Sequence, residues 1–169
     1  NLAQTRELVS QTGADRVEGY SNPLWVFLLS ILSFFFKDLF LLKGLGIFFL
    51  IMSLFCLLNA SADNKTFYLP YILTTVFVAM QPSVVIWSLS GLENSLYLWG
   101  GVELLIRANK IADNTATKTD SIIAGFAVSV LALTRPEGIV FITFYPLIVF
   151  VFHNDKISRK THVLYSVLP

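Results

Sequence analysis

Charge is scarce in this sequence. Among 169 residues, 12 are Lys or Arg and 11 are Asp or Glu, so 14% are charged and the formal net charge is +1. Soluble domains usually contain about 25% charged residues. Proteins that bind nucleic acid present a basic surface, which a net charge of +1 does not indicate. A soluble enzyme, a disordered segment and a nucleic-acid partner are therefore all disfavoured.

Cysteine and histidine are scarce as well. The single cysteine, Cys56, lies in an apolar run and has no intrachain partner for a disulfide, so we interpret it as a small buried hydrophobe. The two histidines, His153 and His162, have no second ligand at the spacing of a metal site. The sequence also contains no phosphate-binding glycine loop and no Gly-x-Ser-x-Gly motif, so it carries neither of these signatures of nucleotide binding and hydrolysis.

Apolar residues are abundant. They make up 55% of the chain, 15 residues are Phe, and the mean hydropathy is +0.69. Apolar runs with few or no charges are typical of membrane crossings, and they predict an all-α, polytopic helical membrane protein with about five transmembrane helices. The predicted crossings are residues 39–59, 67–89, 94–106, 121–134 and 139–153.

The first apolar run, Pro23–Phe36, differs from the others in length. It has only about 14 residues, which suits an interfacial or re-entrant helix better than a crossing. Asn22 is a good N-cap, and Pro23 suits the first helical position. We therefore predict a juxtamembrane helix that lies along the membrane surface.

We expect a single domain over residues 1–169. Residues 1–38 would form the first outer loop with its juxtamembrane helix, and residues 39–169 a transmembrane helix bundle. The chain begins with Asn1 and stops at Pro169 soon after a new apolar stretch begins, so we expect a fragment truncated at both ends.

The positions of Lys and Arg predict the orientation, because cytoplasmic loops of membrane proteins are enriched in these residues. With the crossings above, seven basic residues fall on one side and five on the other. The larger group is Lys65, Arg107, Lys110, Lys118, Lys156, Arg159 and Lys160, and the smaller group is Arg6, Arg16, Lys37, Lys43 and Arg135. We predict that the first side is cytoplasmic, with Asp113–Asp120 as an exposed polar loop there.

Three polar segments interrupt the apolar sequence: Arg16–Trp25 (RVEGYSNPLW), Ser90–Glu93 (SGLE) and Leu133–Gly138 (LTRPEG). In the predicted topology, all three emerge on the side opposite the cytoplasm. Ionisable residues at helix ends on one side of a membrane are what an active site facing that side requires.

Two of these segments also have a purely structural interpretation. Ser90 and Glu93 have the spacing of a capping box, in which each would bond to the backbone amide of the other. Pro136 cannot continue the helix before it and suits the first turn of the next, where Glu137 would complement the positive end of the helix.

Aromatic and basic residues in the segments leave further alternatives open. Tyr20 and Trp25 suit interfacial anchors at least as well as ligand contacts. Arg135 lies between two apolar runs, where its guanidinium would suit a lipid-linked phosphate that it can bind through two hydrogen bonds.

In this order and spacing, RVEGYSNPLW, SGLE and LTRPEG resemble motifs of bacterial membrane glycosyltransferases of the GT-C class, related to the terminal arabinofuranosyltransferases of cell-wall synthesis. The resemblance covers roughly residues 1–153. It implies an enzyme of the bacterial cytoplasmic membrane with its active site on the extracytoplasmic side. Its partners would be membrane lipids, a polyprenyl-phosphate-linked sugar donor and a glycan, lipid or protein acceptor.

The resemblance also implies a site. Its catalytic base would belong to an acidic pair that this sequence lacks and that we expect upstream of Asn1; Asp15 does not take its place. Glu93 matches an acidic residue near the donor phosphate and often near a divalent cation, so it is the candidate metal ligand. The substrate-binding candidates are Arg16, Glu18, Tyr20, Asn22, Glu93, Arg135 and Glu137.

A second class of function competes with the enzyme. A transporter, a flippase-like protein or a noncatalytic envelope-assembly subunit could use the same carboxylates and arginines along a path or an interface. A transporter would more naturally carry ionisable residues in the middle of its spans. In the sequence they gather at one set of helix ends, which favours the glycosyltransferase.

Overall fold

The computed structural model describes residues 22–35, 40–63, 68–152 and 162–164. Within these ranges the regular elements are helices and no strand occurs, which confirms the predicted all-α fold. The elements are α2 (Pro23–Phe35), α3 (Phe40–Asp63), α4 (Tyr68–Met80), α5 (Pro82–Leu89), α6 (Asn94–Ala112), α7 (Lys118–Thr134), the 3-10 helix η1 (Pro136–Ile139) and α8 (Val140–Phe152).

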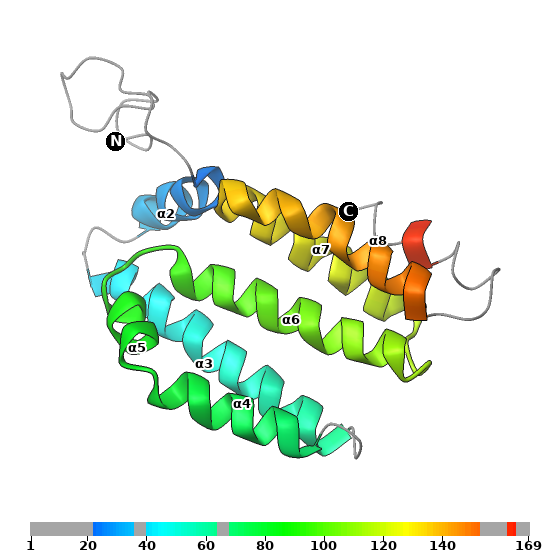
Figure 1. Cartoon of the computed structure of the whole chain (residues 1–169). Helices are drawn as coiled ribbons and strands as arrows, with labels where there is room; N and C mark the ends of the chain where they lie inside the picture. Colours follow the sequence, from blue (N-terminus) through cyan, green and yellow to red (C-terminus); the bar gives the residue numbers. More distant parts are fainter. Residues whose placement is uncertain (1–21, 36–39, 64–67, 153–161, 165–169) are drawn as a thin grey trace.

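Helix α6 occupies the middle of the bundle. It packs against α3 and α5 on one side and against α7 and α8 on the other, while α2 packs on α7 (Figure 1). Helix α7 runs antiparallel to both α6 and α8. The start of α6, the end of α7 and the start of α8 therefore share one end of the bundle. That end carries two of the three polar segments, and the α6–α7 loop lies at the other end.

Two layers of buried side chains hold α6 in place. Toward α7 and α8 the core contains Leu104 and Leu131, and toward α3 and α4 it contains Leu57 and Ile106. Gly100 allows a close approach, because a Cβ there would lie only 3.1 Å from the Leu131 side chain. In a membrane, where lipid tails are as apolar as leucine, such close packing of small residues favours helix association.

The predicted helix at Pro23–Phe36 is confirmed, since α2 spans Pro23–Phe35. Trp25, however, is buried with only 3% of its surface exposed, and it packs with Leu96 and Val130. Its indole Nε1 donates to the backbone oxygen of Gly91 at 3.3 Å. The interpretation of Trp25 as an interfacial anchor was therefore wrong, because its ring fills a gap between α2, α6 and α7.

The predicted crossing at 67–89 is not one continuous helix. α4 ends at Met80, α5 begins at Pro82, and the two are bent by 60°. Proline has no N–H to donate and disfavours a helical conformation in the residue before it, and Gln81 is accordingly extended (φ −76°, ψ 109°). The bend brings α5 against α3, where the missing side chain of Gly46 makes room for the Ser88 carbonyl.

Among the described residues, one helix is by itself long and apolar enough to cross a membrane, at Lys43–Ala62. The bent pair α4 and α5 gives a second if it counts as one broken span. α6 has 19 residues but includes Glu103, Arg107 and Lys110, and α7 has 17 residues. The remaining apolar helices, Pro23–Phe34 and Pro136–Phe152, are shorter.

Candidate functional site

Three of the predicted site residues meet at one end of the bundle. Asn22 Nδ2 donates to Glu93 Oε2 at 3.0 Å, and Arg135 Nε donates to Glu93 Oε1 at 3.3 Å. These contacts join residues 71 and 42 positions apart in the sequence. The structure thus brings together one residue from each of the three polar segments.

Glu93 lies at the centre of this group and is 9% exposed. It precedes α6 directly as its N-cap, but its side chain makes no capping hydrogen bond. Ser90 instead ends α5, and its hydroxyl donates to the Trp87 carbonyl at 2.6 Å. The capping-box interpretation was therefore wrong: both carboxylate oxygens of Glu93 are directed at long-range partners.

Arg135 has a more open position. It ends α7 in an extended conformation, and its side chain is 39% exposed. Its guanidinium carbon lies 5.8 Å from the centre of the Tyr97 ring, within reach of a cation–π interaction. Among the described residues, its hydrogen bond to Glu93 uses Nε only. The two terminal nitrogens therefore have no protein acceptor there and can bind an anion.

Two glycines position the loops that carry these residues. Gly91 has a φ of 77°, which a residue without a side chain adopts at little cost. At Gly138 an added Cβ would collide with the backbone oxygen of Leu131, so η1 packs directly on the last turns of α7. As predicted, Pro136 begins the next helical element, with Glu137 exposed in its first turn.

Other predicted site residues are not brought into the group. Arg16, Glu18 and Tyr20 lie outside the described residues. Glu137 lies on the same turn as Arg135, but no hydrogen bond or ion pair connects it to Glu93 in the described part of the chain.

The metal role of Glu93 stays a prediction. Among the described residues there is no cluster of three or more His, Cys, Asp or Glu that could hold an ion. Both Glu93 oxygens accept hydrogen bonds from protein groups, and each keeps a further lone pair.

The sequence analysis missed a second ionic cluster, which lies from the middle of α6 toward its C-terminal end. Arg107 pairs with Glu103 at 2.8 Å and with Asp120 at 3.3 Å, and Lys110 pairs with Asp120 at 3.1 Å. Glu103 also accepts a hydrogen bond from the thiol of Cys56 at 3.1 Å. The four-residue spacing of Glu103 and Arg107 on a helix was the signal that could have found it.

Asp120 belongs to α7 rather than to an exposed loop as predicted. Thr117 and Asp120 form a capping box, and the Asp120 side chain is 8% exposed. Burial opposes ionisation of this carboxyl, but hydrogen bonds from Thr117 and Lys110 outweigh burial and hold its pKa below the usual range.

His162 is also more buried than its position in the tail suggests. It is 4% exposed, and its Nδ1 lies 2.5 Å from the hydroxyl of Ser121. The hydroxyl of Tyr145 in turn donates to Ser121 at 3.5 Å. This contact connects the segment 162–164 to α7 and α8.

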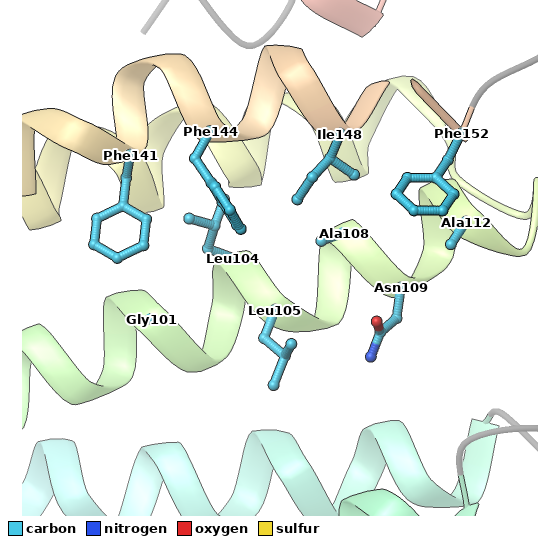
Figure 2. A pocket seen from close by; sticks show the side chains of 10 residues that line it. All are labelled: Gly101, Leu104, Leu105, Ala108, Asn109, Ala112, Phe141, Phe144, Ile148 and Phe152. Atoms are coloured by element: carbon cyan, nitrogen blue, oxygen red, sulfur yellow. The ribbon is translucent and has the colours of Figure 1, made fainter. Parts of the chain in front are cut away.

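A groove of about 400 Å³ lies between α6 and α8 (Figure 2). Asn109 is its one polar side chain among the described residues, and the other lining residues are Gly101, Leu104, Leu105, Ala108, Ala112, Phe141, Phe144, Ile148 and Phe152. Its volume is within the range of small-ligand sites.

Comparison of the chain with protein-family models, with curated proteins and with solved structures finds no match. The features of the chain that bear on its function are therefore the contacts of Asn22, Glu93 and Arg135.

Proposed function

We propose that the chain is part of a bacterial membrane glycosyltransferase that transfers a sugar from a polyprenyl-phosphate donor to an extracytoplasmic glycan, lipid or protein. The observation that carries this proposal is the contact of Asn22, Glu93 and Arg135. These residues come from the three segments that resemble the GT-C class, and a carboxylate and a guanidinium at a membrane boundary are costly to retain without a function.

The proposal places the bundle in a membrane with about five crossings, and the apolar surface of the described helices supports the membrane environment. Large apolar side chains are exposed along several helices, including Phe77 and Met80 on α4 and Phe150 on α8, at 64–76%. Soluble monomers rarely expose continuous apolar patches of this kind. Broken and short crossings such as α4–α5 are tolerated where neighbouring helices satisfy the freed backbone groups.

In this proposal each residue has a distinct role. The terminal nitrogens of Arg135 bind the donor phosphate and stabilise the charge that develops on it as the bond to the sugar breaks. Glu93 holds the guanidinium through Nε, and Asn22 holds the second oxygen of Glu93. None of these three residues is assigned as the base that takes the proton from the acceptor hydroxyl.

Sugar transfer in the full-length protein tests the proposal. Arg135→Gln should reduce the rate by on the order of a hundredfold, the usual cost of losing one contact to the transition state. Glu93→Gln should also reduce the rate, because the Arg135 guanidinium then loses its charged partner. Arg135→Lys should retain partial activity, because it keeps the charge but loses the paired donors. Lys118→Gln, at the opposite end of the bundle, should leave the rate unchanged.

Folding must be measured alongside activity, by thermal unfolding of each variant in detergent. If Glu93→Gln turns over normally, Glu93 supports the structure and does not act in the site. If Arg135→Gln also turns over normally, the active site does not lie at this end of the bundle, and the proposal is wrong.

One observation favours the competing class of function. Glu103 and Arg107 lie in the middle of α6, where a transporter would be expected to carry ionisable groups. If the protein is a transporter, Glu103→Gln should abolish movement of a polyprenyl-phosphate sugar across the membrane of sealed vesicles. If the protein is a glycosyltransferase, the folded variant should still transfer the sugar, because Glu103 lies roughly 15 Å along α6 from Glu93.

A further inference from the structure

Arg135 extends from the end of α7, and two side chains at the start of α6 contact it. Glu93 accepts a hydrogen bond from its Nε at 3.3 Å, and its guanidinium carbon lies over the Tyr97 ring, 5.8 Å from the ring centre. Glu93 and Tyr97 are joined by a helical hydrogen bond, from the Tyr97 amide to the Glu93 carbonyl at 3.0 Å. Residues four apart on a helix lie on the same face, so one turn of α6 presents both contacts to the guanidinium.

The two contacts restrain Arg135 in different ways. An arginine side chain has many rotamers, and fixing them when a ligand binds costs conformational entropy. The Arg135 side chain is 39% exposed, so packing alone does not fix it. The hydrogen bond to Glu93 holds Nε but leaves the guanidinium able to turn about that single contact. A ring beneath the guanidinium limits this motion, because a cation is attracted to the face of an aromatic ring.

Tyr97 is itself held firmly by its neighbours. Its ring contacts the Phe141 ring edge-on with centres 6.5 Å apart, and Phe141 contacts Phe144 in the same way at 5.9 Å. Figure 2 shows Phe141 and Phe144 extending from α8 toward α6. Tyr97 and Phe141 also pack against the core cluster that contains Leu104 and Leu131. The ring beneath Arg135 is therefore a fixed surface.

We infer that Tyr97 is the positioning residue for Arg135: its ring holds the guanidinium in the orientation in which the two terminal nitrogens bind the donor phosphate. The inference rests on the proposed function and adds a residue outside the three polar segments to that site. Tyr97 acts through Arg135 and needs no contact with the donor. A binding group whose orientation is fixed before the ligand arrives loses less entropy on binding, so the ring strengthens donor binding.

Kinetics of sugar transfer by the full-length protein, measured over a range of donor concentrations, test the inference. Tyr97→Leu should raise the KM for the donor by about three- to tenfold, the usual strength of a partly exposed cation–π contact. Its kcat should stay close to that of the wild type, because the guanidinium that acts in the transition state is still present. Tyr97→Phe keeps the ring and should retain the wild-type KM. Tyr97→Met fills a similar volume without a ring and should behave as Tyr97→Leu does.

A double-mutant cycle separates positioning from a general effect on the structure. In an Arg135→Gln background, Tyr97→Leu should have no further effect on the KM, because the group that Tyr97 positions is absent. Phe126→Leu is the matched control, since it removes a ring that contacts Trp99 edge-on at 6.4 Å on another part of the bundle. This control should leave the KM unchanged.

Several outcomes would overturn the inference. A lower kcat with an unchanged KM in Tyr97→Leu and Tyr97→Met would show that the ring only supports folding. A rise in KM that persists in the Arg135→Gln background would show that Tyr97 acts independently of Arg135. An equal rise in Tyr97→Phe would assign the effect to the hydroxyl instead of the ring.

The same measurements distinguish this inference from the proposed function. If Arg135→Gln slows sugar transfer but Tyr97→Leu and Tyr97→Met match the wild type, the phosphate site stands and the positioning role of Tyr97 is wrong. If Arg135→Gln itself transfers sugar normally, the proposed function is wrong and the inference falls with it.

Discussion

At the scale of single residues, the role of Glu93 depended on groups far from it in the sequence. Its spacing from Ser90 is that of a capping box, and its position in SGLE is that of a site residue. The structure excludes the capping box, because the two carboxylate oxygens of Glu93 accept hydrogen bonds from Asn22 and Arg135 instead. A local pattern could not show this, since the competing hydrogen bonds come from other helices.

The amide of Asn22 provides a test of this arrangement. Asn22→Asp replaces the donor amide by a second carboxylate against Glu93, and two like charges at this distance repel each other. We expect the variant to unfold at lower temperature than the wild type at pH 7. Thermal unfolding of the two proteins measures the difference.

Asn22→Ala is the control, because it removes the hydrogen bond without adding charge. It should cost about 1 kcal/mol at most pH values. Equal stability of Asn22→Asp and wild type at pH 7 would show that the Asn22–Glu93 contact does not form.

At the scale of elements, three helical elements begin where the local chemistry of proline favours a start. Pro23 begins α2, Pro82 begins α5 and Pro136 begins η1. The crossing predicted at 67–89 follows from hydropathy, which does not register the break at Pro82; α4 and α5 pass together as one bent span. The bend is then stabilised by packing of α5 against α3, which no local signal predicts.

Two glycines on α3 test that packing as a matched pair. Gly46→Ala puts a Cβ against the Ser88 carbonyl, so we expect it to lower the free energy of unfolding by about 1–3 kcal/mol. At Gly44 an added Cβ has no atom within 4 Å. Gly44→Ala should therefore raise the free energy of unfolding by about 0.5–1 kcal/mol, because alanine favours a helix more than glycine does. Chemical unfolding in mixed micelles compares the two, and equal effects would exclude close packing of α3 on α5.

The capping box at the start of α7 predicts how the stability of the protein changes at low pH. The pKa of Asp120 is lowered in the folded chain, so its contribution to stability is present above the unfolded pKa of about 3.9 and is lost as the pH falls through the lower folded pKa. Asp120→Asn should therefore be less stable than the wild type at pH 7. Its deficit should diminish below about pH 4.

Unfolding midpoints from pH 7 to pH 2.5 measure this effect. Thr117→Ala is the companion variant, since it removes the cap but keeps the carboxylate, and it should cost about 1 kcal/mol at pH 7. A deficit in Asp120→Asn that stays constant over the whole range would show that Asp120 has the same pKa in both states.

At the scale of the whole molecule, Lys118 begins α7 and Glu137 follows its end in η1, so the two residues lie at opposite ends of that helix. Both residues are exposed, so cysteines there should be accessible to reagent. In a Cys56→Ser background, we expect Glu137→Cys to react with an impermeant thiol reagent added outside intact cells. Lys118→Cys should react only after permeabilisation. Labelling of Lys118→Cys in intact cells would overturn the predicted orientation.

The sequence by itself determined an all-α chain and the helix starts at Pro23 and Pro136, and it marked out three polar segments among apolar runs. These follow from local backbone chemistry and from hydropathy. Only the tertiary structure decided which polar groups meet. Glu93 binds Asn22 and Arg135, Asp120 is buried beside Arg107, and Trp25 fills the core, because burial and long-range hydrogen bonds depend on how α6 packs between its neighbours.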